Sequence, residues 1–487
     1  MAQAPFRDAS SILALTARRP VRIRQWHSSP RNSTVRVKHP VLVSTYPSID
    51  SHDPLCTSSR TIMILGPVSL LDALVFCILL LPQLLWHVGL LRTLRVGFET
   101  LPFLLLQLPL DTFRHRLWLP ASTLPVFWRE SSLFEYIVIR CVRHAFKNIP
   151  PDVGKVFFSK AVTLPFLRWR MLRHGLVRCP TYWHEVVLHE EDRATRGLWL
   201  RHDPHRSPDI VIFYLHGGGF SLGSSYFYLE FLLAWLHLLV NAGFENPAVF
   251  ALDYTLVPDA VYPTQLSEVT RGYSQALEVA GDASRVCLAG DSAGGALVLS
   301  LLLQLGARAR DSGIAPSVVP VPAAPCMAVL ISPWVKLKSD AHYQSEVDYL
   351  DRQRLWQYAQ AYAGEEMVHR QPASPGTCTD EKLWRAAAPQ RGYVVVFGEQ
   401  EVFAPDIENF VSLQARSGVK VETSRFEGGI HAWPVVSLFL SDQADRRLQG
   451  LRYLVGQISR LARSDAKEVA DTVVLRLDQV TRHTLAK

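Results

Sequence analysis

The chain has few cysteines, and none of them lies in a spacing that binds metal. Seven cysteines occur among 487 residues, with no Cys-x-x-Cys pair. An odd number of scattered cysteines supplies neither a disulfide framework nor the thiolate cluster of a zinc site. We therefore expect most of them to be free and buried, and we expect no bound metal. They are Cys56, Cys77, Cys141, Cys179, Cys287, Cys326 and Cys378.

The net charge is also low beyond the N-terminal region. The formal net charge is +7, but residues 1–60 hold nine Lys and Arg against three Asp and Glu, so the remaining 427 residues carry only +1. A body so close to neutrality gives no reason to invoke recognition of a phosphate backbone. We therefore expect no nucleic-acid partner. Hydrophobic residues make up 48% of the chain, which is ample for a sizeable core.

No internal repeat divides the chain, and strand-like runs alternate with helical ones after residue 181. Continuous apolar runs of four to eight residues are typical of strands buried on both faces of a parallel sheet. The alternation predicts an α/β fold with a mostly parallel, doubly wound sheet. The expected strands are Trp183–Leu188, Thr195–Leu200, Asp209–Leu215, Ala248–Leu252, Val286–Ala289, Cys326–Ile331, Tyr393–Phe397 and Val419–Glu422.

Residues 1–60 are rich in Arg, Ser and Pro, and no core can be drawn from them. We predict a disordered basic tail here. A mitochondrial presequence, which is also Arg-rich and poor in acids, and an upstream extension ahead of a start at Met63 are the alternatives. Residues 466–487 are predicted to form a C-terminal tail.

Residues 61–91 contain one charged side chain, Asp72, and the last nineteen of them contain none. A helix needs about 20 apolar residues to cross a bilayer core, so this segment is predicted to anchor the protein to a membrane. Pro82 and Gln83 would bend such a helix or place it partly in the interface, which leaves single-pass and monotopic arrangements open. Residues 92–180 are predicted to form a helical linker and cap.

A nucleophile elbow is predicted where the run Val286–Ala289 meets Gly290-Asp291-Ser292-Ala293-Gly294. The pattern is G-x-S-x-G, and a small-residue helix follows it. A serine on so sharp a strand-to-helix turn needs glycines on either side, because neighbouring chain must pass close by. Ser292 is therefore the candidate nucleophile.

A second glycine motif, His216-Gly217-Gly218-Gly219, follows the predicted strand Asp209–Leu215. Consecutive glycines are costly in chain entropy, so a ligand or an oxyanion must need bare backbone there. The dinucleotide reading fails because Gly217, Gly219 and Gly223 miss the spacing of G-x-G-x-x-G by one residue. We predict an oxyanion hole formed by the backbone amides of Gly218, Gly219 and Ala293.

Acyl transfer also needs a base and an acid that orients it. His431 follows the last predicted strand and is the candidate base. Glu399, Glu401 and Asp406 compete for the role of the acid, since all three follow the strand Tyr393–Phe397. The order serine, acid, histidine along the chain is the one found in α/β-hydrolases.

At these motifs the sequence resembles the hormone-sensitive lipase family of α/β-hydrolases, including arylacetamide deacetylases and fungal steryl acetyl hydrolases. The resemblance rests on the two glycine motifs, on Asp253-Tyr254 with Pro258, and on His431. It implies a carboxylesterase without a cofactor, with a catalytic domain over 181–465 beneath a helical cap. Small hydrophobic acetyl or short-acyl esters are the implied substrates, sterol acetates among them. Membrane lipid and the endoplasmic reticulum are the implied surroundings.

The acid segment departs from the family pattern D-x-L-x-D, because it reads Glu401-Val402-Phe403-Ala404-Pro405-Asp406. With the middle apolar residue placed on Phe403, the triad position falls on Glu401, which we predict to be the acid. The alternative function is a catalytically silent protein that binds a small molecule on the same fold, as gibberellin receptors do after losing a triad member. The presence of His431 argues against it.

Overall fold

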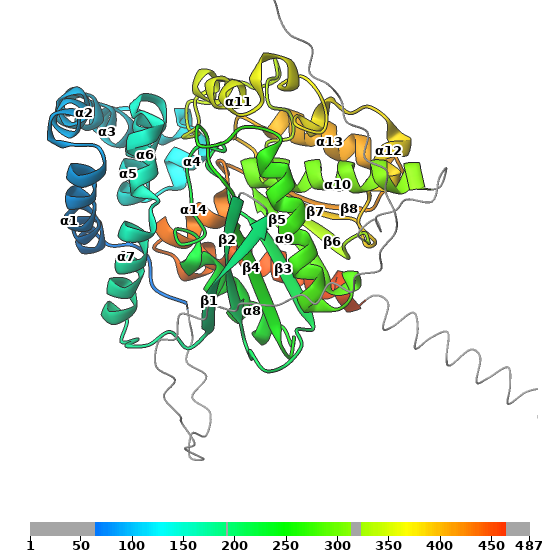
Figure 1. The fold of residues 1–487 in the computed structure, drawn as a ribbon. Coiled ribbons are helices and arrows are strands. Elements are labelled where there is room, and N and C mark those ends of the chain that lie inside the picture. The colour runs from blue at the N-terminus through cyan, green and yellow to red at the C-terminus, as the bar shows by residue number, and fades with distance from the viewer. Residues whose placement is uncertain (1–63, 191–192, 313–322, 464–487) are drawn as a thin grey trace, which may run out of the picture. The chain divides into compact units, whose positions relative to one another are not determined.

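The computed structural model describes residues 64–190, 193–312 and 323–463, which form an eight-stranded sheet covered by helices on both faces (Figure 1). The predicted tails 1–60 and 466–487 lie outside the described residues. The strands are β1 (Tyr182–Glu190), β2 (Arg193–Arg201), β3 (Ile210–Leu215), β4 (Pro247–Asp253), β5 (Val286–Asp291), β6 (Met327–Ile331), β7 (Tyr393–Gly398) and β8 (Val421–Phe426).

The sheet has the order β1-β2-β4-β3-β5-β6-β7-β8. β2 runs antiparallel to both of its neighbours, while the pairs from β4 to β8 are all parallel. β3, β5, β6 and β7 are buried along their whole length, as their unbroken apolar sequences predict. The predicted α/β class and mostly parallel sheet are confirmed. β8 begins two residues later than predicted and extends four residues further.

Two hydrophobic clusters sandwich the sheet. The first packs α9 (Thr264–Ala280), α10 (Ala293–Ser312) and α13 (Ala404–Arg416) on one face. The second packs α8 (Leu229–Asn241) and a helix over 444–463 on the other. Because the strands from β4 to β8 are parallel, their carboxyl ends meet at one edge of the sheet, where ligands bind in open α/β folds.

The remaining helical elements lie before the sheet, in its connections or, for α14, after its last strand. Those before β1 are α1 (Leu70–His87), α2 (Leu90–Pro102), η1 (Phe103–Gln107), α3 (Leu108–Phe113), η2 (Arg114–Trp118), η3 (Ala121–Thr123), α4 (Val126–Glu130), α5 (Leu133–Asn148), α6 (Pro151–Phe157) and α7 (Lys160–Arg173). Those within the sheet region are η4 (Ala283–Arg285), α11 (Arg352–Met367), η5 (Pro375–Thr377), α12 (Glu381–Ala387) and α14 (Trp433–Leu440).

α1 begins with a capping box, in which the Ser69 hydroxyl and the Asp72 carboxylate each accept from the other residue's backbone N–H. Asp72 also faces Arg170 of α7 at 3.2 Å, and both side chains are fully buried. Arg170 donates to both carboxylate oxygens of Glu230 on α8, at 2.8 and 2.7 Å. One guanidinium therefore joins the first described helix to a helix that covers the sheet.

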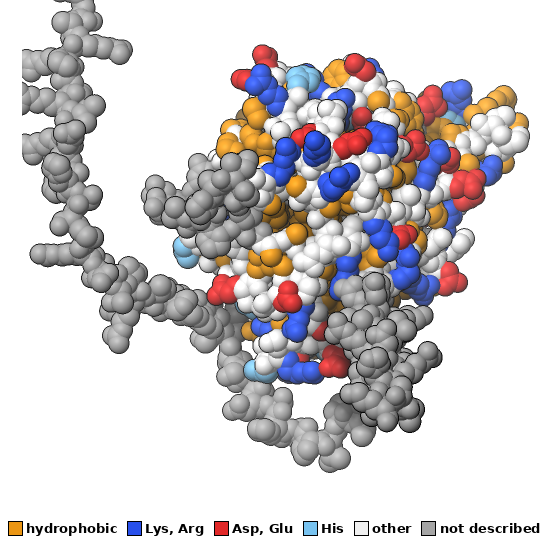
Figure 2. Space-filling model, turned by 90° about the vertical axis from the view of Figure 1, so that its right-hand side faces the viewer, with side chains coloured by type: hydrophobic (Ala, Val, Ile, Leu, Met, Phe, Trp, Pro, Cys, Tyr) orange, Lys and Arg blue, Asp and Glu red, His pale blue; other side chains and the backbone are white. Residues whose placement is uncertain are grey.

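The outward side of the first helices is strongly apolar. Among the residues that the structure describes, 19 of the 27 exposed large hydrophobic side chains lie between Leu70 and Trp118. On α1, Ile78 is 61% exposed and Trp86 is 85% exposed. The face near α12 instead carries acidic and basic side chains in mixture (Figure 2). An apolar surface this concentrated indicates a partner rather than water.

We expect Arg170→Met to lower the free energy of unfolding by about 3–5 kcal/mol, because it leaves the buried Glu230 without its cation and Asp72 with Arg173 alone. Urea unfolding of detergent-solubilised protein, followed by circular dichroism, measures the change. Arg206→Met is the matched control, since Arg206 pairs with Glu245 on the surface and is expected to lose less than about 1 kcal/mol. Equal effects of the two substitutions would contradict the interpretation.

Candidate active site

Ser292 stands at the turn between β5 and α10 with φ of 51°, a conformation that L-residues rarely adopt. The flanking glycines are required by close backbone approach. A Cβ on Gly290 would lie 2.6 Å from the carbonyl carbon of Gly294, and one on Gly294 would lie 1.9 Å from the carbonyl oxygen of Leu215. The strained serine and its tight surroundings are those of the predicted nucleophile elbow.

Asp291, beside the serine, is buried and accepts three hydrogen bonds. The hydroxyls of Tyr214 and Tyr228 donate at 2.6 and 2.7 Å, and the backbone N–H of Gly217 donates at 2.8 Å. Burial raises the pKa of this carboxyl, although all three donors favour its charged form. The bond from Gly217 fixes the second glycine motif against the elbow.

The second glycine motif lies directly beside Ser292: a Cβ on Gly217 would be 3.1 Å from the Cβ of Ser292. Gly218 and Gly219 have φ of 111° and 61°, which glycine adopts without penalty. His216 is held by the Tyr254 hydroxyl, which donates to its carbonyl at 2.8 Å, and by ring stacking at 4.4 Å. Within the described residues, the amide N–H groups of Gly218, Gly219 and Ala293 donate to no protein acceptor. Three donors thus stay available around the elbow.

Nδ1 of His431 faces Oε1 of Glu401 at 3.9 Å. This separation allows charge attraction but is too long for a hydrogen bond. Both atoms are buried, and among the described residues neither has a hydrogen-bond partner. The two unsatisfied atoms point toward each other, so a small movement of either loop would join them.

The pKa of His431 reflects opposing influences. Burial favours the neutral imidazole, but the carboxylates of Glu401, Asp348 and Asp291 outweigh it and raise the pKa. A histidine that acts as a base must be neutral at the start of the reaction. A reaction that depends on it is therefore lost as the pH falls through this raised pKa.

The other two candidate acids lie elsewhere. Glu399 accepts from Arg425 at 3.0 Å and from the N–H of Gly428 at 3.2 Å. Asp406 lies on α13, where it accepts from Ser339 at 3.1 Å and faces His342 at 3.3 Å. Burial lowers the pKa of His342 to about 4, so that imidazole stays neutral. Of the three, the geometry brings only Glu401 to His431.

Ser332, to which the sequence analysis assigned no role, joins the loop of Ser292 to the loops that carry Glu401 and His431. It has φ of 45°, its hydroxyl donates to Glu401 Oε2 at 2.6 Å, and it accepts from the N–H of Ala432 at 2.9 Å. The N–H of Ser292 donates to the carbonyl of Ile331, the residue that precedes Ser332, at 3.0 Å. The only signal in the sequence is that a serine directly follows a buried strand.

Asp348 is the second residue that the sequence analysis missed. It lies between β6 and α11 and is fully buried, with its carboxylate on the backbone N–H groups of Val402 and His431 at 2.9 and 3.3 Å. No spacing in the sequence marks it, because it is distant from both motifs along the chain.

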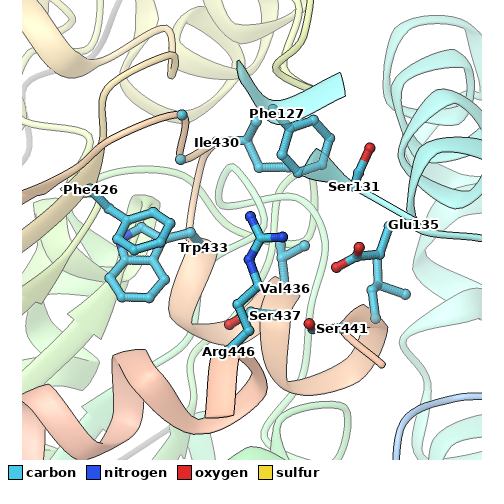
Figure 3. Close-up of a pocket in the computed structure, with 13 residues that line it drawn as sticks. Phe127, Ser131, Glu135, Phe426, Ile430, Trp433, Val436, Ser437, Ser441 and Arg446 are labelled. Atoms are coloured by element: carbon cyan, nitrogen blue, oxygen red, sulfur yellow. The ribbon is translucent and has the colours of Figure 1, made fainter. Parts of the chain in front are cut away.

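A cavity of about 40 Å³ lies behind the histidine loop, between α4, α5 and α14 (Figure 3). Phe426 and Trp433 stack at 4.2 Å on one side of it, and Phe127, Ser131 and Glu135 line the other. A space of this size has room for a few water molecules. Ser292 itself is only 6% exposed, so the described conformation is nearly closed over the nucleophile.

In the described ranges, no group of three or more His, Cys, Asp or Glu side chains is arranged to hold a metal ion. The loops that carry Ser292, His431 and Glu401 are joined through Ser332, and they supply a hydroxyl, an imidazole and a carboxylate, with backbone N–H groups beside the serine. These are the parts that acyl transfer requires.

Comparison with known proteins agrees with this geometry. A family model described as the alpha/beta hydrolase fold matches residues 212–435. A fungal esterase structure from Rhizomucor miehei superposes with a TM-score of 0.54 at 20% identity, covering 68% of this chain and 97% of that one. A likeness at this identity shows the fold alone.

Three relatives found by sequence comparison also match this chain. LipR of Mycobacterium tuberculosis, named as an acetyl-hydrolase, is 36% identical over 137 residues, 28% of this chain and 39% of that protein. The hormone-sensitive lipase of Mus musculus is 34% identical over 116 residues, 23% of this chain and 14% of that protein. The protein mug81 of Schizosaccharomyces pombe, named as a steryl acetyl hydrolase, is 26% identical over 344 residues, 68% of this chain and 83% of that protein.

The chain thus spans well under half of the first two relatives and most of the third. The names of all three share one class of activity, that of a carboxylesterase-type hydrolase. On its fold, on the family model that matches residues 212–435 and on these relatives, the chain is an α/β-hydrolase similar to the hormone-sensitive lipase family.

Proposed function

We propose that this protein is a serine ester hydrolase acting on small hydrophobic acetyl or short-acyl esters, with sterol acetates as one candidate class. The observation that carries the proposal is the strained Ser292 beside three unpaired amide N–H groups, linked through Ser332 to the Glu401–His431 pair. The relatives' names support ester hydrolysis. A series of p-nitrophenyl esters of increasing chain length, followed by sterol acetates, defines the substrate.

In the proposed mechanism, His431 takes the proton of the Ser292 hydroxyl as the oxygen attacks the ester carbonyl. The oxyanion is held by the amides of Gly218, Gly219 and Ala293. The imidazolium gives its proton to the departing alcohol and leaves an acyl-serine. Water then attacks the acyl-serine with His431 again as base, which releases the acid. Glu401 orients the imidazole and stabilises its charged form.

The first prediction is that a fluorophosphonate probe labels the folded wild-type protein at Ser292, because the probe reacts only with an activated serine. Mass spectrometry of the labelled peptide locates the adduct, and Ser292→Ala is the matched control. If the folded wild type is not labelled, or if Ser292→Ala is labelled equally, the alternative of a silent binding protein replaces this proposal.

A second prediction concerns the acid. Glu401→Gln removes the charge that orients His431 while keeping the shape, so kcat on p-nitrophenyl acetate is expected to fall by about 10³-fold or more. Circular dichroism checks that the fold is intact. Glu399→Gln and Asp406→Asn are the controls, with much smaller expected losses. A crippled Asp406→Asn beside an active Glu401→Gln would transfer the role to Asp406.

We also propose that the helices from α1 to η2 dock the enzyme on a membrane, where hydrophobic esters partition. α1 is long and apolar enough to cross a bilayer. Its inner side, however, packs on the helical region, with Phe76 against Phe166 at 5.1 Å and Leu80 beside Val162. Asp72 ties the same side to Arg170. These contacts favour a monotopic helix lying in one leaflet, with the endoplasmic reticulum as the proposed membrane.

The docking proposal predicts that the double substitution Ile78→Glu and Trp86→Glu weakens binding to phosphatidylcholine vesicles by about tenfold or more, since two exposed apolar side chains that would insert into the membrane become charges. Co-sedimentation measures the binding, and hydrolysis of p-nitrophenyl acetate in solution is expected to stay unchanged. Val261→Glu, at a residue 49% exposed just before α9, is the matched control. Wild-type vesicle binding by the double variant would refute the docking surface.

A further inference from the structure

Asp348 is a second buried carboxylate beside the base, and the mechanism above gives it no task. Its two oxygens accept from two different loops, Oδ2 from the N–H of Val402 at 2.9 Å and Oδ1 from the N–H of His431 at 3.3 Å. Val402 directly follows Glu401. One side chain therefore bridges the loop that carries the acid and the loop that carries the base.

Asp348 is itself held from several sides. Its N–H donates to the hydroxyl of Ser345 at 3.1 Å, and that hydroxyl donates to the carbonyl of Gln400 at 2.7 Å. Arg143, on α5 of the helical region, donates to the carbonyl of Asp348. The neighbouring Tyr349 ring lies 5.7 Å from the ring of His431. This segment connects the helical region to both loops.

The charges around His431 come from three elements. Glu401 faces it from the loop after β7, Asp291 from the end of β5, and Asp348 from the segment before α11; all three favour the imidazolium. Arg143 is the cation on the far side of Asp348. Burial, together with the nearby Glu401, raises the pKa of Asp348 to about 6, so its carboxyl is charged above that pH.

We propose that Asp348 is a positioning residue for the His431–Glu401 pair, an inference that rests on the proposed function. Its hydrogen bonds keep the two loops in register. Its charge adds to that of Glu401 in stabilising the imidazolium that forms when Ser292 loses its proton. Removing the charge makes the imidazolium less stable, so the pKa of His431 falls and the acid limb of the activity profile moves to lower pH.

The test is Asp348→Asn, with kcat and KM for p-nitrophenyl acetate measured as a function of pH. We expect kcat to fall by about 10²-fold, as for other misplaced catalytic groups, with little change in KM. The acid limb of kcat/KM is expected to move down by about one pH unit. Asp406→Asn, which alters a buried carboxylate bound to Ser339 and His342, is the matched control; its loss of kcat is expected to be much smaller, and its acid limb is expected to stay in place.

A second variant, Ser345→Ala, loosens the segment but keeps the charge, so kcat is expected to fall by a smaller factor while the acid limb stays in place. A folded Asp348→Asn variant with wild-type kcat, or with an unmoved acid limb, overturns the proposal. If Asp348→Asn does not fold, wild-type kcat in Ser345→Ala overturns it instead. An inactive wild type would refute the proposed function, which is a separate result.

Discussion

The candidate site depends on the burial of one carboxylate. Asp291 accepts from two tyrosine hydroxyls and from Gly217, and it is adjacent to Ser292. A charged group without water needs several donors, and here the donors come from β3, from the start of α8 and from the glycine motif. The hydrogen bond from Gly217 to the Asp291 carboxylate therefore holds the glycine motif against the elbow in the absence of substrate. Oxyanion stabilisation requires donors that are preorganised in this way.

The other half of the site follows from the parallel sheet. β5, β6 and β7 are adjacent, so Ser292, Ser332 and Glu401, which follow their carboxyl ends, gather at one edge. Hydrogen bonds from Ser332 then join the acid loop to Ala432, next to the histidine. The acid and the base are still 3.9 Å apart in a nearly closed site. The surrounding loops thus hold the two side chains near contact.

Local patterns in the sequence were enough to predict the strands and both glycine motifs, because each depends on residues that are close in the chain. Glu401 could be chosen only through the family pattern, since three carboxylates share one loop and their partners are distant. Ser332 carried only the signal that it directly follows a buried strand, and Asp348 carried none, because their roles come from contacts 54 to 100 residues away. The inner side of α1 was also unpredictable, since Asp72 looked like an isolated charge in an apolar run.

The buried network of Asp72, Arg170 and Glu230 makes the apolar helices part of the catalytic body rather than a detachable tether. Arg170 pairs with Asp72 of α1 and with Glu230 of α8, and its guanidinium also donates to the carbonyls of Gly66 and Pro67. A protease that cut after α1 and released it would strip these partners and uncover Phe76's aromatic neighbours. Release of α1 by proteolysis is therefore expected to destabilise the rest of the protein rather than to free it intact.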